Sequence, residues 1–240
     1  MMTRTLYFIF LGWYTIGFLL LFFWEVPDWL QFSNSIFLIL LALTTVTLYQ
    51  FHIRNFLIAL LIGFVTFFIE VIGVTTGFPF GTYSYTDTLG FHVWQVPFTL
   101  GFAWVGVIYL SMFLATSTNR WIRSLQVGFL VVLIDLILDP AAIAMEFWNW
   151  QHDGIYFGIP LTNFIAWFLI AAFVSFWIPV VKLNATLQWK GVRLFQLILF
   201  FFGVLTAKEG LPEILFVTFS SMLLVEGWYR YDQRQKRSSL

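Results

Sequence analysis

Apolar runs separated by short polar stretches divide the chain into eight segments. About 20 apolar residues, within a range of roughly 17–25, let a helix cross the hydrocarbon core of a bilayer. We therefore expect an all-α, polytopic membrane helix bundle with about eight transmembrane helices. The predicted helices cover residues 7–24, 35–51, 56–74, 96–115, 121–144, 160–181, 192–207 and 212–228.

Basic residues gather at alternate ends of these segments, and this pattern predicts the orientation of the bundle. With a cytoplasmic N-terminus, Lys208 is the one basic residue of the twelve that would lie outside. Because cytoplasmic loops carry an excess of Lys and Arg, the pattern favours an N-in, C-in topology. The predicted outer face carries acidic residues instead: Glu25, Asp28, Asp87, Asp153, Glu209 and Glu213.

The composition agrees with a membrane protein, since 60% of the residues are hydrophobic and 10% are charged. We expect residues 1–240 to form a single integral membrane domain in the cytoplasmic membrane of the cell. The first apolar run lacks a small-x-small cleavage site, so we interpret it as an uncleaved span. A net charge of zero argues against a nucleic-acid partner, and the absence of cysteine excludes disulfides and thiolate metal ligands.

Acidic residues interrupt the third and fifth predicted helices near their outer ends. A carboxylate deep in hydrocarbon costs at least ~2.5–3.5 kcal/mol, so such residues indicate a functional site. Asp135 and Asp139 are four residues apart and share one helix face, while Glu70 lies in the third helix. Pro140 cannot donate a backbone hydrogen bond, and this leaves the Leu136 carbonyl without its helical partner.

Two stretches, 56–115 and 121–181, share one plan, which predicts an internal parallel repeat of helix, loop and helix. Each has an intramembrane acid, an aromatic-x-aromatic triplet thirteen residues later, a loop acid, and a helix that opens P-x-T-x-x-x-A-W. We expect the two halves to face each other across a pseudo-two-fold axis along the membrane normal. Chance similarity in a chain rich in Trp, Phe and Thr is the alternative. The matched positions are Glu70 with Asp135, Tyr83–Tyr85 with Trp148–Trp150, Asp87 with Asp153, and 97–104 with 160–167.

The remaining polar residues favour structural roles. His52, His92 and His152 are isolated, so interfacial hydrogen bonds are favoured over metal ligation. Glu226 precedes Arg230 by one helical turn, which predicts a local ion pair. A di-metal site built from the three intramembrane acids and His152 is a weaker alternative. There is no nucleotide-binding or phosphate-cradling motif, so we expect neither a metal nor another cofactor.

The central part of the chain, about 56–178, resembles the carotenoid biosynthesis membrane-protein family. The resemblance lies in E-V-I-G-V-T-T-G-F-P-F-G-T-Y-S-Y from Glu70, D-L-I-L-D-P-A from Asp135, and W-N-W-Q-H-D-G-I-Y-F-G-I-P-L-T-N-F from Trp148. That family contains the carotenoid 1,2-hydratases and the bisanhydrobacterioruberin hydratases. The resemblance implies addition of water to the terminal C1,2 double bond of an acyclic carotenoid, lycopene-like or longer. The expected partners are therefore this substrate, water, the lipid bilayer and other carotenoid enzymes.

Hydration of such an alkene needs a strong acid, a stabilised cation and a positioned water. A buried carboxylic acid beside a carboxylate keeps its proton, so Asp139 is the predicted acid. Asp135 or Glu70 would then steady the cation and accept a proton from water. Asn163 could orient that water. Aromatic faces stabilise a desolvated cation by ~2 kcal/mol each, and the predicted substrate-binding aromatic residues are Tyr83, Tyr85, Trp104, Trp148, Trp150 and Trp167.

Three other functions are consistent with these residues. A carotenoid end-group cyclase would use the same protonation, but its product would not gain the mass of water. A proton-coupled transporter would also place acids and repeated helices in the membrane, although here the acids gather near one face. A non-catalytic carotenoid-binding protein would leave the pigment chemically unchanged.

Overall fold

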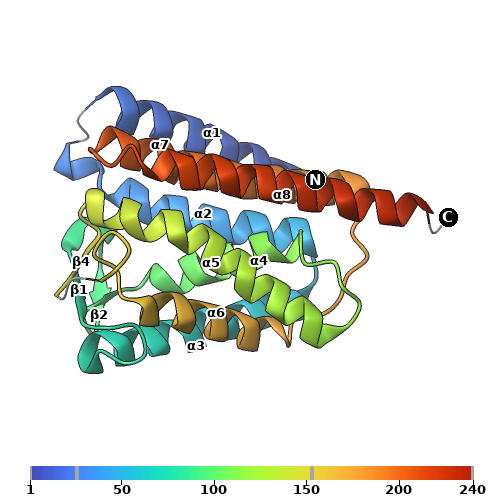
Figure 1. Cartoon of the computed structure of the whole chain (residues 1–240), viewed down its shortest axis with the longest axis horizontal. Helices are drawn as coiled ribbons and strands as arrows, with labels where there is room; N and C mark the ends of the chain where they lie inside the picture. The colour runs from blue at the N-terminus through green and yellow to red at the C-terminus, as the bar shows by residue number, and fades with distance from the viewer. Residues whose placement is uncertain (1, 25–26, 152–153, 239–240) are drawn as a thin grey trace.

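The computed structural model describes residues 2–24, 27–151 and 154–238, and its long elements are all helices (Figure 1). Each of the eight predicted segments overlaps one of them, so the prediction of an all-α helix bundle is confirmed. The helices are α1 (Met2–Phe23), α2 (Phe32–Tyr49), α3 (Ile53–Thr76), α4 (Leu100–Met112), α5 (Arg120–Ala144), α6 (Leu161–Ser175), α7 (Ala185–Lys208) and α8 (Ile214–Ser238). Two short 3-10 turns, η1 (Asp28–Leu30) and η2 (Asp87–Leu89), lie in the connections.

Five of the described helices, α1, α2, α3, α5 and α7, are long and apolar enough to cross a membrane. Several observed boundaries differ from the predicted ones, and α7, for example, begins at Ala185 instead of 192. Helix α4 has 13 residues and α6 has 15, because the chain before each helix forms loop structure and the chain after it leaves the helical path. Nearly every residue of α4 is buried, so this helix is apolar because it lies inside the protein. Helix α8 continues ten residues past its predicted end at 228.

The helices form three rough layers (Figure 1). Helices α1, α7 and α8 lie along one side, α3 and α6 lie along the other, and α2, α4 and α5 lie between them. The connections that carry the strands gather at one end of the bundle, and both termini lie towards the opposite end. The termini therefore share a side, as the predicted topology requires. Which side is cytoplasmic stays a prediction from the basic residues.

The aromatic triplets of the two repeat halves pair with each other. Strand β1 (Tyr83–Tyr85) runs antiparallel to β4 (Trp148–Trp150), with Ser84 opposite Asn149 at the centre. An antiparallel pair that is centred in this way has local two-fold symmetry. The pairing is what a pseudo-two-fold repeat predicts. A second pair, β2 (His92–Val93) with β3 (Val96–Pro97), forms a hairpin within the first loop.

Each half also has one close contact between its two helices, built on equivalent glycines. A Cβ atom on Gly63 of α3 would lie 3.2 Å from the Gly101 carbonyl oxygen of α4. A Cβ atom on Gly128 of α5 would lie 2.8 Å from the Phe168 carbonyl oxygen of α6. Small residues allow this backbone approach in membrane helices. The two helices of each half are therefore held close together about two helical turns before Glu70 in α3 and Asp135 in α5.

Candidate active site

The three intramembrane acids point into the bundle near its strand-bearing end. Glu70 on α3 is 3% exposed, and Asp135 and Asp139 on α5 are 0% and 1% exposed. None of them faces lipid. Glu70 and Asp139 line one cavity, so residues from both repeat halves meet at a common site.

Glu70 accepts three hydrogen bonds through both of its carboxylate oxygens. Its Oε2 accepts from the hydroxyls of Tyr83, at 2.5 Å, and Tyr85, at 2.8 Å. Its Oε1 accepts from the Trp104 indole N–H at 2.8 Å. Since hydrogen bonds donated to a carboxylate favour its charged form, this set of donors is suited to an ionised Glu70.

Tyr83 and Tyr85 remain neutral donors over a wide pH range. Burial, followed by the Glu70 charge, raises the pKa of both phenols above the ordinary value. An alkaline shift of this kind keeps the hydroxyl proton in place. Both residues lie on β1, so the strand pairing fixes the direction from which they approach the carboxylate.

Asp135 and Asp139 both accept a hydrogen bond from Asn163. The Asn163 amide nitrogen donates to Asp135 Oδ2 at 3.0 Å and to Asp139 Oδ2 at 2.6 Å. Asp135 Oδ1 is buried and has no hydrogen-bond partner among the residues that the structure describes. Two carboxyl groups that meet at one nitrogen would repel strongly if both were ionised, because little water reaches them. The arrangement is suited to a pair that retains a proton.

The aromatic residues form a cage around these acids. The equivalent residues Trp104 and Trp167 stack with ring centroids 3.9 Å apart. Tyr83 lies against Trp150 with centroids 5.0 Å apart, and Tyr85 meets Trp148 edge to face at 5.7 Å. The electron-rich faces of such rings attract a cation.

The cavity has a volume of about 50 Å³, which is room for a few water molecules. Of the predicted site residues, Asp135 and Trp104 lie behind the wall and contact residues that line it. The others line it directly: Glu70, Tyr83, Tyr85, Asp139, Trp148, Trp150, Asn163 and Trp167.

The sequence analysis missed several residues of the site. Tyr156, in the second loop, donates through its hydroxyl to the Leu136 carbonyl at 2.8 Å. This is the carbonyl that Pro140 was predicted to free. Burial, with a contribution from Asp135, raises the pKa of Tyr156 to about 12, so its hydroxyl also stays protonated. Leu38 of α2 and Phe202 of α7 complete the cavity from outside the repeat.

The Trp150 indole nitrogen is a further unused group at the cavity. It is buried, and no partner for it is found within the described part of the chain. A buried polar group without a partner costs about 1–3 kcal/mol. This N–H donor is therefore available to a water molecule or to an oxygen of a bound ligand.

His52 and Glu226 have the structural roles that were predicted for them. His52 accepts a hydrogen bond from the Arg54 backbone at the start of α3. Glu226 pairs with Arg230 at 2.7 Å, as predicted, and also with Arg193 at 2.8 Å. Within residues 2–24, 27–151 and 154–238, no group of three His, Cys, Asp or Glu side chains is arranged to hold a metal ion. His152, proposed as a metal ligand, and the loop acid Asp153 lie outside the described residues, as does Glu25.

Comparison with known proteins gives two matches. One relative, a bisanhydrobacterioruberin hydratase of Haloarcula japonica, is 33% identical over 139 residues. The match covers 54% of this chain and 41% of the relative, so this chain spans less than half of that protein. No solved structure matches the chain. A family model described as carotenoid biosynthesis protein matches residues 33–225. Because this match includes both repeat halves and every residue of the acidic cavity, the chain belongs to the carotenoid biosynthesis protein family.

Proposed function

We propose that this protein is a carotenoid hydratase of the cytoplasmic membrane that adds water to the terminal C1,2 double bond of an acyclic carotenoid. The observation that carries the proposal is that two buried acids, Glu70 and Asp139, line one aromatic cavity, with the buried Asp135 directly behind its wall. Such a cavity offers a proton donor, a counter-charge and cation-stabilising rings without any nucleotide or redox group. The printed name of the Haloarcula relative supports the same class of reaction.

Asp139 is the proton donor in this proposal. It lines the cavity, whereas Asp135 lies behind it, and both receive the same Asn163 amide. In the first step, the Asp139 proton adds to C2 of the alkene, the π electrons form the new C–H bond, and C1 becomes a tertiary cation. Asp139 is left as a carboxylate.

Glu70 and the aromatic rings stabilise that cation. The Glu70 carboxylate is held by Tyr83, Tyr85 and Trp104, so it cannot easily swing to capture the cation as an ester. Its charge acts across a dry cavity, where electrostatic stabilisation is stronger than in water. Two or three ring faces at ~2 kcal/mol each would add several orders of magnitude in rate.

A water molecule completes the reaction. Its oxygen bonds to C1, and the proton that it loses returns to Asp139, so the atoms of one water are added in total. The Trp150 N–H at the cavity wall has no partner among the described residues, and this donor supports a water position beside the cation. The product is a tertiary alcohol, and the enzyme regains its starting protonation state.

The polyene of the substrate would lie in an apolar groove between α2, α3 and α4. The groove is lined on α3 from Phe56 to Phe67, one turn below Glu70. At 1.5 Å per residue, the stretch from Phe56 to Glu70 is about 21 Å long. A straight, stiff polyene suits such a groove better than a flexible acyl chain does, because it loses less conformational entropy on binding.

The test is conversion of lycopene in membranes that contain the protein and water labelled with heavy oxygen. The wild type should give a product that is heavier by one labelled water at each hydrated end. Asp139→Asn should lose at least about 100-fold in rate, the usual range for a lost general acid. Glu226→Gln is the matched control, since this acid lies in an ion pair away from the cavity.

Other products would overturn the proposal in defined ways. A product isomeric with lycopene would indicate end-group cyclisation. Uptake of a solute into proteoliposomes with unchanged pigment would indicate transport, and copurified pigment that never changes would indicate a binding protein. Wild-type rates in Asp139→Asn would remove this residue as the donor.

A further inference from the structure

Two further cavities lie between the acidic cavity and the strand-bearing end of the bundle. The middle cavity shares four lining residues with the acidic cavity: Leu38, Leu89, Phe147 and Phe202. It shares Phe147 and five further residues with an outer cavity, including Gly17 of α1, Ser33 of α2 and Met145 after α5. Cavities that share lining residues are adjacent, and the shared side chains separate one from the next. A passage through all three cavities would run between those side chains. We call the outer cavity the vestibule, and we call the four residues shared with the acidic cavity the constriction.

The vestibule and the constriction have opposite chemistry. Polar groups at the vestibule include Asn34, Glu146, Lys208 and Glu209. The constriction consists of four apolar side chains, and Leu89 and Phe147 within it are 3% and 7% exposed. A polar mouth followed by a narrow apolar neck is suited to water and unsuited to a long polyene. Hydrophobic constrictions of this kind control the passage of water by dewetting.

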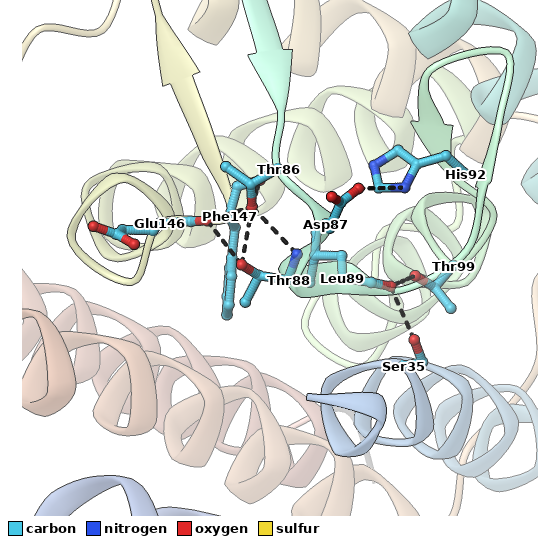
Figure 2. Close-up of polar contacts among 9 residues, drawn as sticks. All are labelled: Ser35, Thr86, Asp87, Thr88, Leu89, His92, Thr99, Glu146 and Phe147. Atoms are coloured by element: carbon cyan, nitrogen blue, oxygen red, sulfur yellow. Dashed lines mark hydrogen bonds and ion pairs between the residues drawn. The ribbon is translucent and has the colours of Figure 1, made fainter. Parts of the chain in front are cut away.

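Hydrogen bonds from the first loop hold both sides of the neck in place (Figure 2). Thr86 Oγ1 donates to the Glu146 carbonyl at 2.5 Å, and the Thr86 backbone N–H donates to the Phe147 carbonyl at 3.0 Å. Ser35 Oγ donates to the Leu89 carbonyl at 2.9 Å, from the start of α2. The backbones of Leu89 and Phe147 are therefore fixed by partners outside the passage, and their side chains face inward.

We propose that the water consumed in hydration enters through the vestibule and passes the constriction of Leu38, Leu89, Phe147 and Phe202 to reach the acids. This inference rests on the proposed function. Water and carotenoid then approach from different sides, the water from the polar end and the polyene from the lipid-facing groove. The neck admits the water needed for capture and keeps bulk water from surrounding Asp139. A flooded cavity would favour the ionised form of Asp139, which has no proton to donate, and would weaken the stabilisation of the cation.

The first experiment measures the passage without measuring activity. The chain has no cysteine, so a single introduced cysteine is the sole target of a thiol reagent. Ser33→Cys marks the vestibule, Leu38→Cys marks the constriction, and Leu60→Cys, on the lipid-facing side, is the control. A small, charged methanethiosulfonate should label Ser33→Cys quickly, Leu38→Cys at least about tenfold more slowly, and Leu60→Cys hardly at all.

Adding Phe202→Ala to Leu38→Cys should speed labelling at position 38 by about tenfold, because removal of the ring opens the neck. Each variant is first checked for a single symmetric peak in gel filtration in detergent. If Leu38→Cys stays unlabelled in the widened protein, or if it reacts as fast as Ser33→Cys without widening, the proposed passage is wrong. These labelling results hold whether or not the protein hydrates a carotenoid.

The second experiment measures turnover. Phe202→Trp narrows the neck and should lower kcat by about tenfold while the KM for the carotenoid stays the same. Phe216→Trp, on the exposed face of α8, is the matched control and should change neither constant. A raised KM at an unchanged kcat would mean that the carotenoid uses the passage, and this would overturn the inference. If the wild type hydrates nothing, the proposed function fails, and the labelling experiment still tests the passage.

Discussion

The two halves of the repeat place an acid at equivalent positions but surround it differently. In the first half, Glu70 receives donors from three aromatic side chains, and both of its oxygens are satisfied. In the second half, Asp135 shares one amide with Asp139, and its Oδ1 has no partner among the residues that the structure describes. Two substitutions between the halves account for much of this difference. Val74 and Leu100 of the first half correspond to Asp139 and Asn163 of the second.

This difference suggests how a symmetric scaffold can support an asymmetric reaction. Each half contributes one strand to the β1–β4 pair and one ring to the stack of Trp104 on Trp167. Hydrogen-bond donors favour a charge in the first half, and crowding of two carboxyl groups favours a proton in the second. Addition of water needs both an acid and a counter-charge. Divergence at a few positions of a duplicated hairpin would supply them.

The largest effect is expected from removal of the charge in the first half. Glu70→Gln should lower the hydration rate by about 100- to 1,000-fold, the range for loss of one electrostatic stabiliser. The amide would also turn an NH₂ group towards donors that need an acceptor. Pigment conversion in membranes measures the rate, and the amount of folded protein in detergent is the control. Near-wild-type turnover would mean that the Glu70 charge in the first half does not stabilise the cation.

A smaller effect is expected from making the second half resemble the first at one position. Asn163→Leu introduces the residue found at the equivalent position 100 and removes the shared donor. Each acid would lose its amide partner at a cost of about 1–3 kcal/mol, so both the melting temperature and the rate should fall. Asn163→Gln, which keeps an amide, should recover part of both. Equal losses in the two variants would contradict this role.

The next prediction concerns the donors of the first half. Tyr85→Phe removes one of the three bonds to Glu70 and should lower the rate by about tenfold, since a hydrogen bond to a charged group contributes about 1.5–3 kcal/mol. The raised pKa of Tyr83 and Tyr85 means that both hydroxyls stay protonated above their ordinary pKa of about 10. The pH–rate profile of the wild type should therefore show no loss from tyrosine ionisation up to that pH. An alkaline decline that disappears in Tyr85→Phe would contradict this assignment.

The smallest effect is expected at the kink of the second half. Tyr156→Phe leaves the Leu136 carbonyl unpaired beside Pro140. The expected loss of stability is about 1 kcal/mol, the usual value for one neutral hydrogen bond. Thermal unfolding in detergent would measure this loss, with Tyr231→Phe on the exposed part of α8 as the control. No change would mean that the freed carbonyl needs no protein partner.

Much of the site was predictable because its signals are local in the sequence. Asp135 and Asp139 share a helix face through their spacing, and the repeat identified the aromatic triplets and the two stacked tryptophans before any contact was known. The sequence also predicted that the Leu136 carbonyl would need a partner. The partner itself, Tyr156, was not predictable, because it comes from an irregular loop whose path depends on the whole fold.

Two other features were missed for physical reasons. Hydropathy cannot distinguish a helix that spans lipid from a short helix buried in protein, so α4 and α6 were predicted too long. Leu38 and Phe202 reach the cavity from helices outside the repeat, where they are ordinary apolar residues in apolar runs. Their role depends on which helices are neighbours, and periodicity carries no information on that.

The glycine contacts have a mechanical consequence. Gly63 and Gly128 bring the helices of each hairpin into backbone contact, which leaves little freedom for sliding within a hairpin. A motion that widens the cavity would therefore carry each hairpin as a rigid body and separate one from the other. The plane between Trp104 and Trp167 is where these bodies would part. The stacked indoles would then hold the two hairpins together in the closed state, and their stacking would break when the end of a carotenoid enters between the hairpins.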